Sequence, residues 1–245
     1  MTSAAQRTIP PHLIFSPPDV PAQPEEGAVF LIDKPKGGSS FDVVRDVRRL
    51  TNQRKVGHAG TLDPMATGLL IVLVARPATR LQAAFMDLPK VYEGTLRLGE
   101  TTPSHDAETD VTERRDASGI TDAALQAACE RFMGTIHQVP PMYSAIKVEG
   151  ERLYEKARRG ETVDRPPRQV RIDSIEMTNR SGPDVSFRVA CSKGTYIRSL
   201  VRDLGAALNV GAHLTVLRRM QIGPYHVDDA WRLPALADAL HSNTS

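Results

Sequence analysis

The stretch Gly57-His58-Ala59-Gly60-Thr61-Leu62-Asp63-Pro64-Met65-Ala66-Thr67-Gly68 is the part of the chain around which the rest is organised. Glycine permits backbone conformations closed to other residues, and the residue before a proline is disfavoured in a helix. The stretch therefore predicts a loop, and an apolar strand candidate follows it at residues 69–75. Its single carboxylate, Asp63, suits the mouth of a pocket, although an Asp-Pro pair also commonly begins an ordinary turn.

The composition is that of an ordinary globular protein. The 245 residues are 40% hydrophobic and 24% charged, and the mean hydropathy is -0.30. No apolar run reaches the roughly 18 to 20 residues that a bilayer span needs, and no signal peptide is recognisable. Cys129 and Cys191 form no CxxC pair. We therefore expect a cytoplasmic protein without membrane contact, disulfide framework or zinc cluster.

The net charge of +2 says little, but the charges are unevenly distributed. Residues 147–171 hold eight Lys or Arg against five Asp or Glu, whereas residues 100–122 hold seven acids against two arginines. Two further basic stretches consist of Arg45, Arg48, Arg49, Arg54 and Lys55, and of Arg198, Arg202, Arg218 and Arg219. Each stretch alone fits a solvated face. Together they favour a polyanionic partner with a defined footprint.

Hydrophobic periodicity predicts strands and helices without a regular alternation. Strands are expected at residues 28–32, 69–75, 91–98, 170–177, 185–191 and 213–220. Helices are expected after Ser39 or Ser40, at 78–86, after Thr121, at 152–159 and after Thr195. This mixture favours an α+β fold with a central mixed, mostly antiparallel sheet flanked by helices and loops.

The domain organisation predicted from the sequence is simple. Residues 1–27 hold six prolines and little apolar periodicity, which indicates a flexible extension. Residues 28–236 contain no convincing linker and predict one domain, and residues 237–245 are expected to be a tail.

The absence of common motifs narrows the chemistry. The chain has no GxxxxGK[ST] loop, no GxGxxG, no HExxH and no GxSxG. An enzyme built on this sequence has to work with carboxylate, arginine, tyrosine and water, and we expect no metal, nucleotide or redox cofactor. Asp63 fits as a nucleophile or a general base, and a neighbouring arginine would favour its ionised form.

Two other motifs supply candidate partners for Asp63. Tyr196 and Arg198 lie between a strand and a helix, and an arginine in the first turn of a helix opposes the helix dipole. Tyr92 lies on a strand candidate and could stack on an extruded base. Each also has a structural interpretation: an ordinary surface arginine, a half-buried strand tyrosine, and for His58 a structural histidine.

Five segments in order carry a resemblance to a known family. They are residues 32–35 (IDKP), 55–64 (KVGHAGTLDP), 140–145 (PPMYSA), 194–198 (GTYIR) and 217–219 (LRR). From about residue 28 to 236 the chain resembles the bacterial tRNA pseudouridine synthases of the TruB type. The resemblance implies a pseudouridine synthase fold and conversion of uridine-55 in the T arm of tRNA to pseudouridine.

The resemblance also assigns roles to residues. Asp63 matches the catalytic aspartate, Arg198 its ion-pair partner, and Tyr92 the tyrosine that stacks on the target base. His58, Tyr196 and Leu217 match substrate-contacting residues. Lys34-Pro35 resembles a structural element beneath the site. Asp63 would attack at the ribose C1′ or the base C6, and the residue that removes the C5 proton stays open.

Two departures from the family accompany the resemblance. Ala59 stands where many members have threonine, and the chain is expected to lack a full C-terminal PUA-type domain. The expected partner is the T-arm stem-loop of tRNA, bound by a monomer. An RNA-folding chaperone activity, alone or beside catalysis, and a hydrolase that releases free uracil are the alternatives, although hydrolases of that kind use paired carboxylates.

Overall fold

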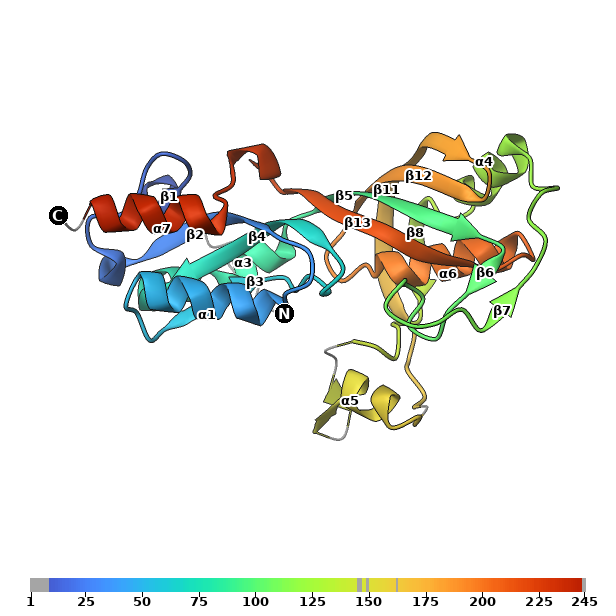
Figure 1. Ribbon diagram of the computed structural model, residues 1–245, viewed down its shortest axis with the longest axis horizontal. Coiled ribbons are helices and arrows are strands. Elements are labelled where there is room, and N and C mark those ends of the chain that lie inside the picture. Colours follow the sequence, from blue (N-terminus) through green and yellow to red (C-terminus); the bar gives the residue numbers. More distant parts are fainter. Residues whose placement is uncertain (1–8, 145–146, 149, 162, 244–245) are drawn as a thin grey trace, which may run out of the picture. The chain divides into compact units, whose positions relative to one another are not determined.

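Two long strands, β5 (Lys90–Leu98) and β13 (Ala212–Ile222), carry the chain between two compact units of the structure. The computed structural model describes residues 9–144, 147–148, 150–161 and 163–243. Unit 1 comprises residues 1–92 and 218–245, and unit 2 comprises residues 93–217 (Figure 1). The single catalytic domain predicted at residues 28–236 includes parts of both units. Its boundaries stay a prediction.

Unit 1 is built on a mixed sheet whose central strand is β4 (Thr67–Val74). β2 (Ala28–Lys34) and β3 (Val56–Ala59) pair with β4 in antiparallel fashion, and β13 pairs with it in parallel through Arg218 and Arg219. β1 (Ile14–Phe15) extends the sheet beside β2, and β14 (Tyr225–His226) pairs with β13. The Asp63 loop, residues 60–66, connects β3 to β4.

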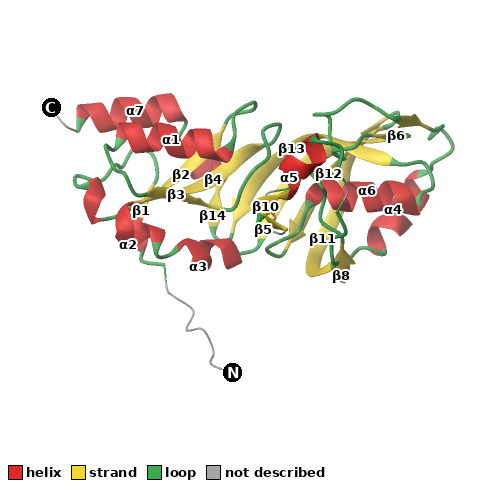
Figure 2. Ribbon diagram, turned by 90° about the horizontal axis from the view of Figure 1, so that it is seen from below, coloured by secondary structure: helices red, strands yellow, loops and turns green. Residues whose placement is uncertain are grey.

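Helices cover both faces of the unit 1 sheet (Figure 2). On one face, α1 (Ser40–Leu50) and α7 (Leu233–Ser242) pack on alternate residues of β2 and β4 such as Phe30 and Val72. On the other, α2 (Ala75–Thr79) and α3 (Gln82–Asp87) pack on Leu31 and Ile71. Because both faces are buried, β4 reads as a continuous apolar run.

Unit 2 contains three antiparallel strands, which pair in the order β12 (Asp184–Cys191), β11 (Arg168–Ser181) and β8 (Gly134–Gln138). In the strand order of the sheet they follow β13 and β5. α6 (Ile197–Ala207) buries Leu200, Val201 and Leu204, and α4 (Asp122–Glu130) contacts β11 and α6. Shorter elements are β6 (Glu100–Thr101), β7 (Glu113–Arg114), β9 (Lys147–Val148), β10 (Glu151–Arg152) and α5 (Leu153–Arg158). The α+β class and the mixed, mostly antiparallel sheet are confirmed.

Two local predictions differ from the structure, and a third is confirmed. The helix expected at 78–86 is divided into α2 and α3. Thr195 does not cap α6: its hydroxyl donates to the carbonyl of Ser192, and Tyr196 is the N-cap residue without a side-chain cap. Ser39, in contrast, caps α1 in a reciprocal capping box with Asp42, as its sequence predicts.

Both ends of the chain are more ordered than predicted. Within residues 9–27, expected to be flexible, Phe15 and Val20 pack against the core, and the 3-10 turns Pro11–Leu13 and Pro24–Glu26 form. Residues 237–242 continue α7, where Leu240 is buried, so the expected tail is helix as far as Ser242. Residues 1–8, 244 and 245 of these two predictions lie outside the described part of the chain.

Candidate functional site

The Asp63 loop contains a tight turn. The amide of Ala66 donates to the carbonyl of Asp63 at 3.0 Å, with Pro64 at the second position of the turn. Leu62 and Met65 are buried beneath the loop, whereas Asp63 is half-buried. The Asp-Pro pair therefore does begin an ordinary turn, and this turn also leaves the carboxylate accessible.

Three buried side chains hold the backbone on both sides of Asp63. The Ser40 hydroxyl accepts from the amide of Leu62 at 2.8 Å and donates to its carbonyl at 3.1 Å. Lys34 Nζ donates to the carbonyls of Ala66 at 2.8 Å and Pro64 at 3.3 Å. Arg219 donates to the carbonyls of Gly60 at 3.0 Å, Thr61 at 3.5 Å and Leu69 at 2.7 Å.

The three donors are at most 2% exposed, and two of them are cations. Burying a cation is costly unless its hydrogen bonds are satisfied. Lys34 and Arg219 satisfy theirs by donating to these carbonyls, which favours keeping both side chains bound to the loop. The loop is thus fixed by the core of unit 1. The resemblance anticipated a structural role for Lys34, but sequence reasoning missed Ser40 and assigned Arg219 to a basic surface.

His58 lies on β3, one residue before Ala59 and close to the guanidinium of Arg219. Burial, and secondarily the charge of Arg219, lowers the pKa of His58, which keeps the imidazole neutral at pH 7. Its Nδ1 is buried and has no hydrogen-bond partner among the described residues. A buried nitrogen in that state is unusual and suits a partner supplied by a ligand.

Arg198 lies in the first turn of α6 and is only 4% exposed. Its guanidinium donates to the carbonyls of Ser104 at 3.1 Å and Tyr143 at 2.7 Å, and it forms an ion pair with Asp106 at 3.4 Å. The interpretation as an ordinary surface arginine is therefore wrong. The burial supports a specific role, because a buried guanidinium needs several partners at once.

Asp106 is fully buried and was missed by sequence reasoning. Its Oδ1 accepts from the Ser104 hydroxyl at 2.5 Å and from the amide of Glu108 at 3.0 Å, which leaves Oδ2 facing Arg198. The sequence signal was present but ambiguous, since Asp106 is one of seven acids in a segment that was considered only for its net charge.

The remaining candidates lie on three different elements. Tyr92 is 8% exposed on β5, and Leu217 is 6% exposed on β13. Tyr196 is half-buried, and the side chain of Gln138 binds its backbone twice, accepting from the amide at 2.8 Å and donating to the carbonyl at 3.0 Å. Gln138, 1% exposed, is another positioning side chain that the sequence did not reveal.

The candidates are divided between the units. His58, Asp63 and Tyr92 belong to unit 1, and Tyr196, Arg198 and Leu217 belong to unit 2. The ion pair between Asp63 and Arg198 that the resemblance implies stays a prediction.

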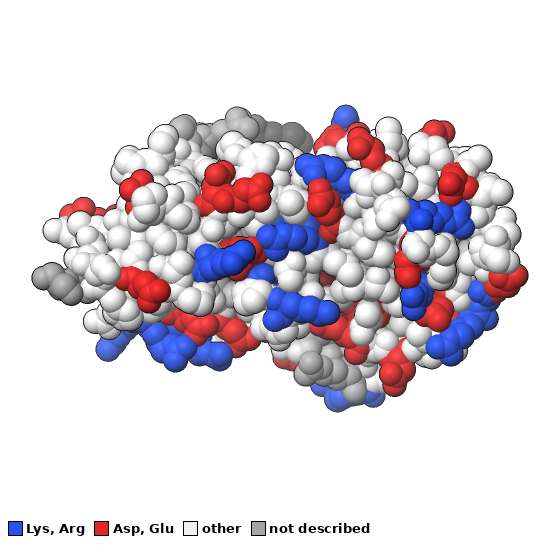
Figure 3. All heavy atoms as spheres, turned by 45° about the horizontal axis from the view of Figure 1, so that its top comes forward, with Lys and Arg blue, Asp and Glu red and all other residues white. Residues whose placement is uncertain are grey.

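Several arginines of two of the basic stretches are buried or paired with aspartates. Arg198 and Arg219 are buried, and Arg218 forms a bidentate ion pair with Asp33 at 2.9 Å. On α1, Arg45 and Arg49 pair with aspartates one turn earlier. On the face drawn in Figure 3, acidic side chains lie among the basic ones.

Neither a metal cluster nor a membrane-spanning helix is found among the described residues. No group of three or more His, Cys, Asp or Glu side chains there is arranged to hold a metal ion. None of the helices in that part of the chain has both the length and the apolar character required to cross a membrane.

Comparison with known proteins gave consistent matches along the chain. Residues 48–197 match the family model of the TruB family pseudouridylate synthase N-terminal domain, and residues 198–245 match that of the tRNA pseudouridylate synthase B C-terminal domain. A protein of Thermobifida fusca named tRNA pseudouridine synthase B is 52% identical over 85% of this chain and 74% of its own length. One of Opitutus terrae with the same name is 46% identical over 86% and 88%.

Solved structures gave similar matches at lower identity. A chain in the crystal structure of a Cbf5-Nop10-Gar1 complex aligns with a TM-score of 0.69 and 32% identity, over 94% of this chain and 60% of that one. A chain in an H/ACA RNP bound to a substrate RNA containing 2′-deoxyuridine aligns with a TM-score of 0.66 and 29% identity, over 94% and 59%. The protein thus spans about three fifths of the length of these two solved chains.

Proposed function

Because the chain belongs to the TruB family of pseudouridylate synthases, we propose that it isomerises a uridine of tRNA, uridine-55 of the T arm, to pseudouridine. The observation that carries the proposal is its 46–52% identity to relatives named tRNA pseudouridine synthase B, over most of both chains. The Asp63 loop supports it, since buried donors from three elements hold the backbone on each side of an accessible carboxylate.

The reaction breaks the bond between ribose C1′ and uracil N1 and forms a bond between C1′ and C5. Asp63 attacks the flipped nucleotide at the ribose C1′ or at the base C6, and both attacks require the ionised carboxylate. The freed uracil turns and rejoins the sugar through C5. The C5 proton is then lost and N1 gains a proton, so that the product is an isomer of the substrate.

The other candidates take positioning roles in this proposal. Arg198 pairs with Asp63 and keeps it ionised, and Asp106 orients Arg198 through their buried ion pair. Tyr92 stacks on the extruded base and so replaces the stacking that the base loses when it leaves the RNA. Tyr196 and Leu217 line the pocket for that base, and His58 contacts the RNA where the base has left. The unpartnered Nδ1 of His58 supports the last assignment.

Release of tritium from tRNA that carries 5-tritiated uridine tests the proposal. The wild-type chain is expected to release one tritium per tRNA, and a transcript with cytidine at position 55 to release none. Asp63→Asn should abolish release and retain most of the tRNA affinity, because phosphate contacts dominate binding. The matched control is Asp116→Asn, at an exposed loop residue. Absence of release by the wild type refutes the isomerase, and free uracil among the products supports the hydrolase.

Three finer expectations accompany this function and stay predictions: a monomeric state, a cytoplasmic location and a tRNA-folding activity beside catalysis. The Asp63→Asn variant separates the last from isomerisation, since a chaperone activity should survive the loss of turnover.

A further inference from the structure

A small open cavity lies in unit 2 beside residues that have no place in the proposed catalytic roles. It has a volume of about 280 Å³, and its lining includes His105, Arg115, Arg202, Thr102, Thr112 and Gly211. We call it the His105 cavity. This volume is just below the size range of small-molecule pockets, about 300 to 1,000 Å³, so the cavity suits a compact group better than a nucleoside.

Three arginines converge on one short segment, residues 139–143, and one of them, Arg202, lines the cavity. Arg202 Nη2 donates to the carbonyl of Val139 at 3.2 Å, and Arg165 Nη1 donates to the carbonyl of Pro140 at 3.0 Å. Arg198 Nη2 donates to the carbonyl of Tyr143 at 2.7 Å. Because Val139 and Pro140 are consecutive, the guanidinium groups of Arg165 and Arg202 are held near one another.

The positive charges of this cluster are unequally compensated. Arg198 pairs with Asp106 at 3.4 Å, and Arg202 pairs with Asp203 at 2.8 Å. Arg165 donates only to carbonyl oxygens and makes no ion pair within the described part of the chain. Burial and then the charge of Arg202 lower the pKa of Arg165. The charge of Asp164 opposes this effect more weakly and without an ion pair. Two arginines that repel each other, one of them without an ion-pair partner, are an arrangement that an anion would stabilise.

His105 lies within the same positive field. Its backbone is fixed in the left-handed region, at φ 61°, by hydrogen bonds of its amide to Thr102 and of its carbonyl to Leu214. Burial, followed by the charges of Arg202, Arg198 and Arg165, lowers its pKa to about 4. The ring is therefore neutral at pH 7 and can donate one hydrogen bond without adding to the repulsion.

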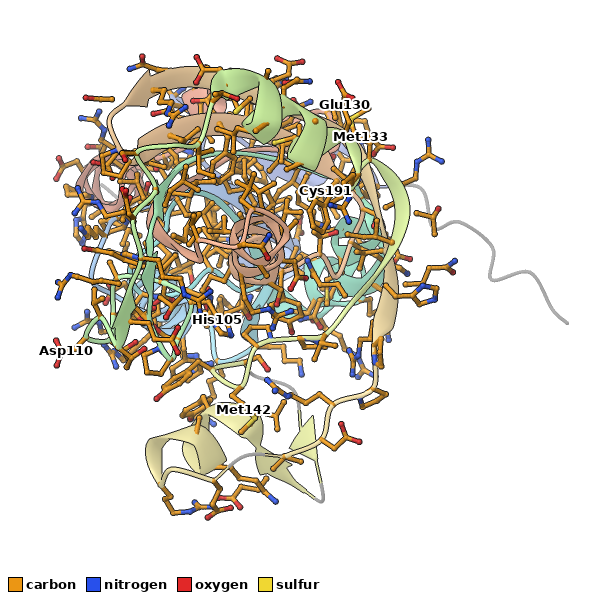
Figure 4. All side chains as sticks on the ribbon, turned by 90° about the vertical axis from the view of Figure 1, so that its right-hand side faces the viewer. His105, Asp110, Glu130, Met133, Met142 and Cys191 are labelled. Atoms are coloured by element: carbon orange, nitrogen blue, oxygen red, sulfur yellow. The ribbon has the colours of Figure 1, made fainter. Side chains whose placement is uncertain are left out.

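The remaining charged groups around the cavity are internally paired. Arg115 and Glu113, which also line it, form an ion pair with each other at 3.2 Å, and Asp106 faces Arg198. In Figure 4, His105 and Met142 lie on the same side of the unit, toward the segment that carries α5. Of the three arginines in the cluster, Arg165 alone makes no ion pair within the described part of the chain, and Arg202, which pairs with Asp203, is its positive neighbour.

We propose that the His105 cavity binds a phosphate group of the RNA substrate, with Arg202 and Arg165 as the cationic contacts and the neutral His105 ring as a hydrogen-bond donor. The planar guanidinium group matches phosphate geometry, and an RNA substrate presents a phosphate at every nucleotide. This inference rests on the proposed function, since it takes its phosphate from the same RNA.

The salt dependence of tRNA binding tests the proposal directly. Loss of one phosphate contact lowers the slope of log K against log salt by about 0.7 to 0.9. We expect this change, with a loss of affinity of about tenfold at low salt, in Arg165→Gln/Arg202→Gln, and a retained slope in Arg165→Lys/Arg202→Lys. The matched control is Arg114→Gln, an arginine that is 74% exposed and lies outside the three basic stretches. An unchanged slope in the double Gln variant, with native thermal unfolding, overturns the proposal.

A second measurement uses the wild-type protein and does not depend on the folding of any variant. NMR titration of the His105 ring should give a pKa near 4 in the free protein and a higher value with tRNA bound, since a phosphate favours imidazolium. A pKa that does not rise on binding contradicts the proposal. Wild-type tritium release, recorded in parallel, distinguishes failure of the phosphate site from failure of the proposed function. Normal release with an unchanged slope refutes only the phosphate site. Absent release refutes the proposed function itself.

Discussion

Replacement of Arg219 by methionine should destabilise unit 1 and displace the Asp63 loop. The side chain is 1% exposed and donates to three carbonyls, two of them within 3.0 Å. Hydrogen bonds from a charged group contribute about 1.5 to 3 kcal/mol each, and removal of the costly buried charge offsets part of this. A net loss of about 3 kcal/mol corresponds to a fall in Tm of about 6 to 12 °C for a chain of this size.

The catalytic effect should exceed the effect on binding. Gly60 and Thr61 lose their anchor in Arg219→Met, and a displacement of about 1 Å at a reacting group can cost about a hundredfold in rate. We therefore expect kcat to fall by about two orders of magnitude while the Kd for tRNA changes little.

The neighbouring residue supplies the matched control. Arg218→Met removes a half-exposed ion pair with Asp33 on the same strand, and such pairs contribute about 1 kcal/mol or less. Its Tm should fall by no more than about 2 to 4 °C. Calorimetry and single-turnover tritium release measure both effects. If Arg219→Met and Arg218→Met are indistinguishable in Tm and kcat, the argument that a buried guanidinium fixes the loop is refuted.

Three further predictions follow from contacts in both units. Asp106→Asn should lower kcat at least tenfold with little change in Kd, since Arg198 loses its buried counterion; unchanged kinetics would remove Asp106 from the site. Gly68→Ala should lower Tm strongly, because an added Cβ would lie 2.3 Å from the carbonyl oxygen of Arg219 at φ 100°, whereas Gly119→Ala, with open space around it, should be nearly neutral. The depressed pKa of His105 adds stability that is complete above about pH 6.5 and is lost as pH falls toward about 4, because the unfolded chain binds the proton more readily. His105→Gln should flatten Tm against pH in that window, and an unaltered pH profile would contradict the neutral buried ring.

Most of the helices and strands that were predicted correctly depend on short-range sequence patterns. The Ser39 cap of α1 and the alternation along β5, where Tyr92, Leu96 and Leu98 are buried, depend on neighbours within a few residues. The motif resemblance extended this to the pseudouridine synthase fold and the tRNA-modifying function, and the family matches confirm both. α7 was missed although Leu233, Leu236 and Leu240 have helical spacing, because the end of the chain was interpreted as a tail.

The supporting residues of the site depend on contacts between distant segments. Arg219 binds carbonyls 150 to 159 positions earlier, and Gln138 binds a backbone 58 positions later. Composition and periodicity carry no information about such pairs. Arg219 in a basic stretch looked like a surface cation, since its burial follows from the parallel pairing of β13 with β4. The burial of Asp106 likewise depends on a distant segment, because its ion-pair partner Arg198 lies on α6.

The most direct test of the central claim, that Asp63 acts on a flipped uridine, is a crystal structure of the protein with a T-arm stem-loop that carries 5-fluorouridine at position 55. The fluorine at C5 blocks the last proton loss, so the nucleotide should be retained in the site. We predict that it lies outside the RNA stack, stacked on Tyr92, with the Asp63 carboxylate at C1′ or C6 and the Arg198 guanidinium paired with that carboxylate. A nucleotide still stacked within the RNA, or one whose C1′ and C6 lie against a different acid, would contradict the account.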